Sequence, residues 1–192
     1  RRVVSVGGSL DRIAGLDNFC WPDPVESEKT PDGAYKMAQL VRANKALYDV
    51  TTGFRVPAIS GKDSMKNDSV RGGRKISIPP TVLFSTIGKI EDVRRAVTMH
   101  FKCAGDAIYV VGLTKEELGG SEYYRMLARE QGTPFSYGGN VPKLDIAGAL
   151  TLYRAMSTAI SNGLLRSSHT PTLGGLAVAF ALASIGGDLG AD

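Results

Sequence analysis

Residues 56–68, which read VPAISGKDSMKND, decide how the first half of the chain folds. The apolar segment 56–59 predicts a short buried strand, and the polar run from Gly61 to Ser64 predicts a loop at the end of that strand. Glycine lets a backbone approach a ligand closely, and exposed N–H groups, a lysine and a serine hydroxyl suit a phosphate. The run lacks the spacing of a Walker A loop, and a polar hairpin loop is the more common structure for such residues.

The segments on either side of this run predict alternating strands and helices. Pro22 and Pro24 require a loop, and Thr30 followed by Pro31 predicts the start of a helix with Thr30 as its N-cap. Apolar residues at helical spacing extend this helix to about Tyr48. Strands are expected at 3–6, 76–78 and 81–87, an extended piece at 13–19, and a short helix at 91–97.

A change in composition at 99–106 marks a predicted boundary in the chain. Residues 107–111 (AIYVV) then predict a buried strand, and the strongest helical pattern runs from 145 to 162, with Gly163 as its C-terminal stop. Residues 174–184 are apolar on all sides, so this predicted helix should lie in a core. A shorter helix is expected at 121–129 and a loop at 131–141.

The composition is that of a globular protein. Of the 192 residues, 43% are hydrophobic and 22% are charged, and no apolar run reaches the roughly 18 residues of a membrane span. The net charge of +4 is small and scattered, which argues against nucleic-acid binding and suits an anionic small substrate. Two distant cysteines and two histidines argue against a zinc site and favour free thiols in a reducing cytoplasm. The chain has neither an initial methionine nor a signal peptide, so a processed or excised piece is expected.

Six short segments of the chain are weak family signals one by one, but their order along the chain is a specific signal. They are LDNF at 16–19, GKDSM at 61–65, KISIPP at 75–80, GKIEDV at 88–93, LGGSEY at 118–123, and His169 followed by GGLAVA at 174–179. In this order they resemble the phosphoribosylformylglycinamidine synthase family, the amidotransferases of purine biosynthesis. The resemblance covers nearly the whole chain.

The resemblance implies an α/β (α+β) fold like that of aminoimidazole ribonucleotide synthetase. The family carries this fold as two tandem repeats, and the chain resembles the second repeat. Residues 1–98 would form its N-terminal half, incomplete at its start, which pairs with a partner repeat through sheets. Residues 99–192 would form a truncated C-terminal α/β half. Such a piece would be inactive alone, and its uncovered apolar surface at 174–184 would favour a homo-oligomer.

The reaction that the resemblance implies converts formylglycinamide ribonucleotide to formylglycinamidine ribonucleotide. ATP phosphorylates the formyl oxygen, and ammonia from glutamine, delivered by a glutaminase domain or subunit, displaces the phosphate. The implied cofactors are ATP or ADP, with Mg²⁺ in the full enzyme. The implied partners are the substrates, the first repeat of the same enzyme and the glutaminase, with no nucleic acid and no membrane. The family's catalytic histidine belongs to the first repeat, so no catalytic residue is expected in this chain.

The resemblance also implies roles for individual residues. Asp17 and Gly61 would lie near the nucleotide, and Ser64 would contact a phosphate of the substrate or the nucleotide. Lys62 is a point charge that suits a phosphate and cannot bind Mg²⁺. Asp63 is either a metal ligand or the partner of Lys62, and both alternatives stay open.

The chain departs from the family pattern just before its last predicted helix. The family has His-Asp-x-Ser-Asp-Gly-Gly where this chain reads HTPTLGG, with Thr170 and Leu173 in place of the two aspartates. Thr172 keeps a hydroxyl, and the helix start at Gly174 and Gly175 could still receive an anion. Threonine is a poor ligand for a hard cation, so weak or no Mg²⁺ binding is expected. The alternative functions are a degenerate scaffold repeat and another ATP-dependent member of the same superfamily.

Overall fold

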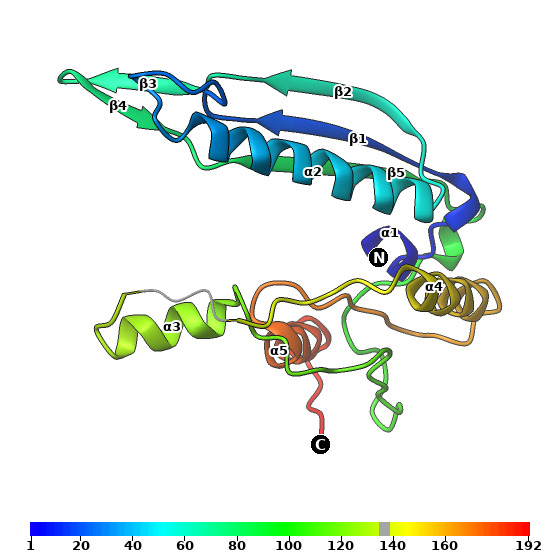
Figure 1. The fold of residues 1–192 in the computed structure, drawn as a ribbon. Coiled ribbons are helices and arrows are strands. Elements are labelled where there is room, and N and C mark those ends of the chain that lie inside the picture. The colour runs from blue at the N-terminus through cyan, green and yellow to red at the C-terminus, as the bar shows by residue number, and fades with distance from the viewer. Residues whose placement is uncertain (135–138) are drawn as a thin grey trace. The chain divides into compact units, whose positions relative to one another are not determined.

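The computed structural model of the chain describes residues 1–134 and 139–192. The middle of the loop predicted at 131–141 lies outside the described residues. Helices and strands are mixed along the chain, which confirms the expected α/β class in its broad sense (Figure 1). None of the described helices is long and apolar enough to cross a membrane.

Two compact units make up the structure. The sheet unit comprises Asp11–Lys89, and the helical unit comprises Arg1–Leu10 together with Ile90–Asp192. The expected division between residues 98 and 99, into two halves of a synthetase-like fold, stays a prediction.

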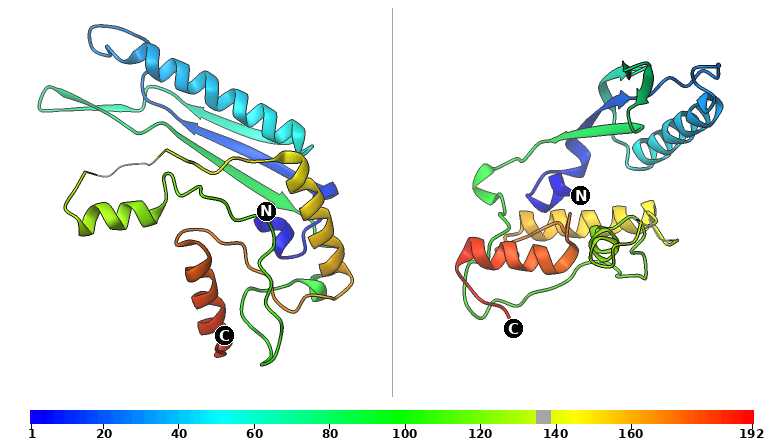
Figure 2. Two further views of the ribbon diagram at one scale, coloured as in Figure 1. Left: turned by 60° about the horizontal axis from the view of Figure 1, so that its bottom comes forward. Right: turned by 90° about the vertical axis from the view of Figure 1, so that its left-hand side faces the viewer.

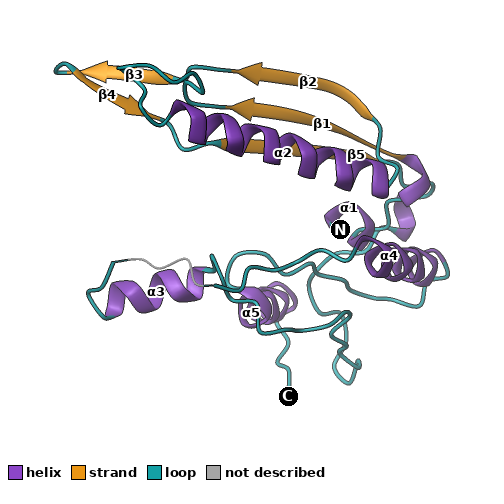
Figure 3. Cartoon of the chain, viewed as in Figure 1, coloured by secondary structure: helices purple, strands orange, loops and turns teal. Residues whose placement is uncertain are grey.

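Three strands form the main sheet of the sheet unit, in the order β2-β1-β5 (Figures 1 and 3). The 3-10 turn η1 (Leu10–Arg12) leads into the central strand β1 (Ile13–Cys20), which pairs in parallel with β2 (Ala58–Ser64) and antiparallel with β5 (Thr81–Gly88). Parallel neighbours need a long crossover, and helix α2 (Gly33–Gly53) supplies it. The helix lies along one face of the sheet (Figure 2). The extended piece predicted at 13–19 and the strand predicted at 81–87 are both confirmed, as β1 and β5.

Helix α2 begins and ends later than the sequence predicts. Its N-cap is Asp32 rather than Thr30, and the Asp32 side chain makes no capping hydrogen bond. Thr30 is instead fully buried in a turn, where it exchanges backbone hydrogen bonds with Ser27 (3.2 and 2.9 Å). The helix continues to Gly53 because no proline or glycine follows Tyr48 before that position.

A separate two-stranded hairpin follows β2. Strands β3 (Asp68–Arg71) and β4 (Arg74–Ser77) pair antiparallel around Gly72 and Gly73. Both glycines have a positive φ, 55° and 74°, as a two-residue hairpin turn requires. The strand predicted at 76–78 is confirmed in part, because β4 begins earlier and ends before the two prolines that follow.

The core of the sheet unit centres on Phe19 and Trp21, which are 2% and 3% exposed. Their ring centres lie 6.0 Å apart, and the indole N–H of Trp21 donates to the backbone carbonyl of Lys36 in α2 (3.0 Å). Gly15 is required on the same strand, because a Cβ at that position would lie 2.3 Å from the ring of Phe84. Alternate residues of a strand share a face, so Gly15, Phe19 and Trp21 mark the face of the sheet that α2 covers.

Three helices in the described part of the helical unit are longer than two turns. They are α3 (Glu122–Glu130), α4 (Ile146–Ser161) and α5 (Gly175–Gly187). Ser121 and Asp145 cap α3 and α4, since each side chain accepts a hydrogen bond from a backbone N–H of the first turn. The helices predicted at 121–129, 145–162 and 174–184 are therefore confirmed.

Residues 3–6, which were expected to form a strand, lie largely in the short helix α1 (Arg2–Ser5), so that prediction is wrong. The amide of Gly8 donates to the carbonyl of Val3 (2.8 Å), which folds the segment back on itself. Val4 is fully buried, so burial within the unit decides the conformation here over the strand preference of valine.

Residues 107–111, expected to be a buried strand, form no strand, and this prediction is also wrong. Ile108 and Tyr109 are exposed, and no described segment pairs with them. A β-branched run is stable as a strand only where a neighbouring strand satisfies its backbone. The helix predicted at 91–97 is reduced to one 3-10 turn, η2 (Val93–Arg95).

Helix α5 forms as predicted, but only one side of it is buried. Ala179 and Ala183 are buried, whereas Leu182 and Ile185 are exposed. The prediction of burial on all sides is wrong for this chain, because the described residues leave the outer side of α5 uncovered. The exposed side agrees with the uncovered apolar surface expected at 174–184, and the homo-oligomer stays a prediction.

Candidate functional site

The run from Gly61 to Ser64 lies inside strand β2 and not in the loop that the sequence predicts. In the register with β1, Asp17 stands opposite Gly61 and Phe19 stands opposite Asp63. The run becomes a strand because β1 offers hydrogen-bonding partners to its backbone. Since β2 is an edge strand, its other backbone N–H groups point away from β1.

Asp17 and Gly61 approach each other closely across the two strands. A Cβ at Gly61 would lie 3.2 Å from Asp17 Oδ1 and 3.3 Å from Oδ2. Glycine at this position therefore leaves the Asp17 carboxylate room above the neighbouring strand. The structure thus brings together the two residues that the resemblance places near a nucleotide.

Alternation along the strands divides the predicted residues between the two faces of the sheet. Asp17 and Asp63 lie on the same face as Phe19, the face that α2 covers. Lys62 and Ser64 lie on the opposite, open face, where the Lys62 ammonium donates to the Ser64 hydroxyl (2.8 Å). Among the described residues, no ion pair joins Lys62 to Asp63, so the partner of Lys62 is Ser64.

The other three predicted residues form the start of α5 in the helical unit. Gly174 and Gly175 have φ values of 85° and 65°, which side-chain-bearing residues rarely adopt. The amide of Gly175 donates to the carbonyl of Thr172 (3.2 Å), so this N–H is used within the turn. The structure brings these three residues together, whereas it divides the five on β1 and β2 between the two faces of the sheet.

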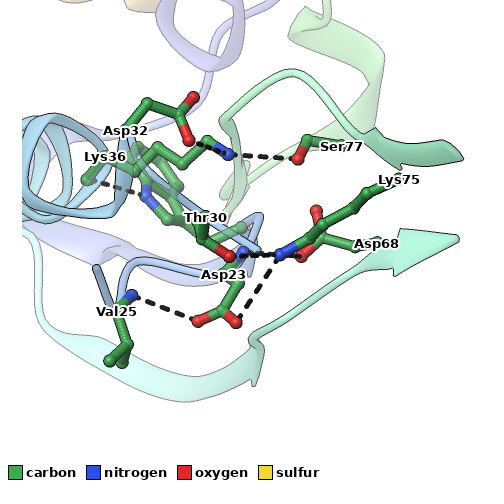
Figure 4. Close-up of polar contacts among 9 residues, drawn as sticks. Asp23, Val25, Thr30, Asp32, Lys36, Asp68, Lys75 and Ser77 are labelled. Atoms are coloured by element: carbon green, nitrogen blue, oxygen red, sulfur yellow. Dashed lines mark hydrogen bonds and ion pairs between the residues drawn. The ribbon is translucent and has the colours of Figure 1, made fainter. Parts of the chain in front are cut away.

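A polar network at the base of the hairpin holds β3 and β4 in place (Figure 4). The Lys75 ammonium lies 3.3 Å from Asp68 Oδ2 and 3.7 Å from Asp23 Oδ2, and it donates to the Thr30 hydroxyl (2.5 Å). The backbone N–H of Asp23 donates to the Asp68 carboxylate (3.0 Å). The side chains of Asp68, Asp23 and Lys75 are only 9%, 19% and 25% exposed, so solvent screens these charges incompletely.

Asp68 is the most buried carboxyl group of the network. Burial raises its pKa, but the Ser77 hydroxyl, the N–H of Asp23 and the Lys75 ammonium together outweigh burial, and the pKa of Asp68 is lowered from its ordinary value. Asp68 Oδ1 is buried and receives no hydrogen bond from the described residues. Asp68 is therefore charged at neutral pH.

Lys36 extends the network into α2. Its largely buried ammonium lies 2.9 Å from Asp32 Oδ1 and donates to the Ser77 hydroxyl (3.1 Å). The hydrogen bond from Lys36 is the main reason that the pKa of Asp32 is lowered. Because the Lys36 carbonyl also accepts the Trp21 indole N–H, one residue ties the start of α2 to β4 and to the core.

The sequence analysis missed this network. In KISIPP the apolar residue Ile76 suggests an inward side chain, yet Ile76 is exposed and its neighbours Lys75 and Ser77 face the network. Lys75 and Ser77 share a strand face, and Asp68 is paired with Ser77 in the hairpin. The sequence signal for the network is the alternation of side chains along β4, which places Lys75 and Ser77 on one side of a short strand.

No three histidine, cysteine, aspartate or glutamate side chains gather as a metal site within the described residues. Asp17 and Asp63 are two carboxylates on neighbouring strands and on one face of the sheet. Mg²⁺ is usually bound by one or two carboxylates together with phosphate oxygens and water. This pair therefore fits a nucleotide-bound Mg²⁺ better than a metal held by protein ligands alone.

Comparison with known proteins identifies relatives along the whole chain. No protein-family model matches it. The chain is 34% identical over 192 residues to the phosphoribosylformylglycinamidine synthase subunit PurL of Gloeobacter violaceus and 33% identical over 191 residues to that of Alkaliphilus metalliredigens. The PurL subunit of Methanocaldococcus jannaschii is 30% identical over 192 residues, and the alignments cover 99–100% of this chain.

The chain is homologous to a segment of PurL. The family resemblance that six short segments indicated is thereby confirmed. The chain spans 23–24% of the length of these PurL subunits. The candidate site residues on β1, on β2 and at the start of α5 therefore align with a segment that makes up about a quarter of each PurL subunit.

Proposed function

We propose that this chain forms part of a phosphoribosylformylglycinamidine synthase of purine biosynthesis and supplies a nucleotide- or phosphate-binding face. The similarity to PurL along the whole chain is the observation that carries this proposal. The proposed reaction of the complete protein is the ATP- and glutamine-dependent conversion of formylglycinamide ribonucleotide to formylglycinamidine ribonucleotide. The proposed fold is the second synthetase-like repeat, and the proposed partners are the first repeat and a glutaminase.

Lys62 and Ser64 are the groups proposed to bind a phosphate. Both lie on the open face of β2. The hydrogen bond that the Lys62 ammonium donates to the Ser64 hydroxyl is exposed to solvent. An ammonium and a hydroxyl that are already adjacent can turn to a phosphate with little rearrangement, and a charged acceptor forms stronger hydrogen bonds than a hydroxyl does. The start of α5, with Thr172, Gly174 and Gly175, is proposed as a second contact for an anion.

Asp17 and Asp63 are the groups proposed to face the metal or the ribose of the nucleotide. Mg²⁺, when bound there with a nucleotide, would neutralise phosphate charge. A ligand that lies along the edge strand β2 can meet side chains from both faces, which accounts for carboxylates on one face and Lys62 on the other. Two carboxylates alone hold free Mg²⁺ weakly. Millimolar or tighter binding of free Mg²⁺, lost in Asp63→Asn, would contradict the expectation that free Mg²⁺ binds weakly.

A scaffold role is the second candidate function. The open face of the sheet carries exposed apolar side chains, including Leu16, Leu83 and Ile87. Such a face is suited to packing against another sheet. Thr170 and Leu173, which replace two aspartates of the family pattern, also favour structural use of this part of the protein over catalysis.

Calorimetric titration of ADP and ATP, with and without Mg²⁺, tests the phosphate site. We expect binding to weaken roughly tenfold in Lys62→Ala, since a hydrogen bond to a charged group is lost. Lys115→Ala removes an equal charge from an exposed position in the helical unit and should leave binding unchanged. Absence of binding to the folded chain, or equal weakening in both variants, would remove the support for a phosphate site on β2.

The reaction is tested in a complete enzyme. This chain would replace the matching segment of a PurL subunit, and the formation of ADP that depends on formylglycinamide ribonucleotide and glutamine would be measured. The synthase proposal expects activity in the chimera and a reduced kcat/KM in Lys62→Ala and Ser64→Ala. An active chimera whose kcat/KM is almost unchanged by both substitutions would instead establish the scaffold role.

A further inference from the structure

We propose that a hollow in the helical unit, lined by three arginines, binds a small anion that carries a phosphate group. The hollow has a volume of about 430 Å³, within the range of roughly 300–1,000 Å³ typical of small-molecule sites. Arg94, Arg95 and Arg166 line it together with apolar side chains and the backbone around the end of α4. We call it the arginine hollow. It shares no residue with β1, β2 or the start of α5.

Two segments far apart in the sequence form the arginine hollow. The turn η2 supplies Arg94 and Arg95, and the residues after α4 supply Arg166. Backbone contacts fix the two segments next to each other, because the amide of Ser168 donates to the carbonyl of Thr98 (3.1 Å) and a β-bridge joins the same region. The three guanidinium groups are therefore brought together by the fold and not by proximity in the sequence.

Arg94 contributes the least to this site, because Asp92 occupies its guanidinium fork in a two-point contact. Its Nε and Nη2 atoms donate to the two oxygens of Asp92 (2.9 and 2.8 Å). This contact raises the pKa of Arg94 and is the main reason that the pKa of Asp92 is lowered, with a smaller contribution from Arg95. An anion in the hollow must therefore be held mainly by the other two arginines.

Arg95 and Arg166 have most of their hydrogen-bonding capacity left. A guanidinium has five N–H donors. One N–H of Arg166 donates to Asp106 (2.9 Å), and one of Arg95 donates to the backbone carbonyl of Ser161. Among the described residues no ion pair is found for Arg95. Two under-used planar forks from different segments suit the several oxygens of a phosphate, which accept paired hydrogen bonds.

Three groups near the hollow oppose an anion. Asp92 and Asp106 carry negative charge, and the C-terminal carbonyls of α4 present the negative end of the helix dipole. Asp92 is already engaged by Arg94 and Asp106 by Arg166, and among the carbonyls at the end of α4 that of Ser161 is engaged by Arg95. The three arginines therefore outnumber the two carboxylates, which leaves a net positive charge at the hollow.

Pyrophosphate is the probe that tests the site, in a chain that carries Lys62→Ala so that the proposed site on β2 cannot contribute. Calorimetry at about 50 mM salt limits screening of exposed charges. We expect binding to weaken about fivefold to tenfold in Arg95→Gln and in Arg166→Gln, because each loses a charged donor pair. Arg95→Lys, which keeps the charge and loses the fork, should give an intermediate loss.

Arg154→Gln is the matched control, since Arg154 is an exposed arginine of α4 outside the hollow. Unchanged binding in this variant, with weakening in the other two, would support the site. ADP in place of pyrophosphate distinguishes a nucleotide from a simpler phosphate ligand. Absence of pyrophosphate binding, or equal weakening in Arg154→Gln, would overturn the proposal. If Arg95 only caps α4, Arg95→Gln will lower the thermal stability while Arg166→Gln leaves binding unchanged, which would also overturn it.

Discussion

Replacing Lys75 by methionine tests whether the network at the base of the hairpin stabilises the sheet unit. Methionine keeps much of the apolar stem, so the change removes a charge and leaves Asp23 and Asp68 close together without that cation. Removing one partner costs about 3–5 kcal/mol for a fully buried ion pair and about 0–1 kcal/mol for an exposed pair. With Lys75 25% and Asp68 9% exposed, we expect the free energy of unfolding to fall by about 2 kcal/mol.

Trp21 provides the measurement. It is the only tryptophan of the chain, and it is buried and hydrogen-bonded to Lys36, so its fluorescence reports unfolding of the sheet unit. In urea, a loss of about 2 kcal/mol with a slope of roughly 1–3 kcal/mol per molar corresponds to a midpoint lower by about 1 M. Following one fluorophore also avoids mixing this transition with that of the helical unit.

The pH dependence gives a second readout of the same change. The pKa of Asp68 is lowered in the folded protein, so its contribution to stability is present above the ordinary carboxyl pKa of about 3.9 and is lost as the pH falls through the folded-state pKa. The stability difference between the native chain and Lys75→Met should therefore be full at pH 7 and shrink below about pH 4. A difference that is independent of pH would show that lost packing, and not lost charge, causes the effect.

Lys45→Met is the matched control, because Lys45 makes an ion pair of similar length with Asp49 (3.2 Å) on the exposed surface of α2. We expect it to change the free energy of unfolding by less than about 0.5 kcal/mol. Adding Asp68→Asn to Lys75→Met should recover part of the loss, since it removes an uncompensated charge. Equal urea midpoints for Lys75→Met and Lys45→Met would refute the reasoning.

Four further substitutions separate packing from ligand binding in the sheet unit. Phe19→Ala should cost about 3–5 kcal/mol in urea unfolding, whereas the exposed Leu83→Ala should cost less than about 1 kcal/mol. Gly33→Ala should cost roughly 1–3 kcal/mol or more in thermal unfolding followed by circular dichroism, because its Cβ would lie 2.3 Å from backbone atoms of the preceding loop. Gly61→Ala should change stability by less than about 1 kcal/mol, since the Asp17 side chain can move aside, yet it should weaken Mg²⁺-dependent ADP binding in calorimetry. Unchanged ADP binding in this last variant would separate Asp17 from the nucleotide.

The parts of the fold that the sequence predicts well are those decided by neighbours in the sequence. Ser121 and Asp145 cap α3 and α4, and Gly163 follows α4 with a φ of 70°, so the ends of both helices follow from local contacts. The strand preference of residues 3–6 and 107–111 misleads, because a strand also needs a partner strand. For neither segment does the described structure supply one.

The site residues show the same limit in a sharper form. Glycine, lysine and aspartate in the run 61–64 are typical of a loop, and only the parallel register with β1 makes the run a strand. That register also fixes which residues can act together, because it places Asp17 beside Gly61. Alternation along β2 then puts Asp63 and Lys62 on opposite faces of the sheet. A pairing between residues more than forty positions apart, which α2 connects, leaves no periodic signal in either segment. Residue types thus indicate that the run can bind a phosphate, whereas only the fold decides which of its side chains one ligand can reach.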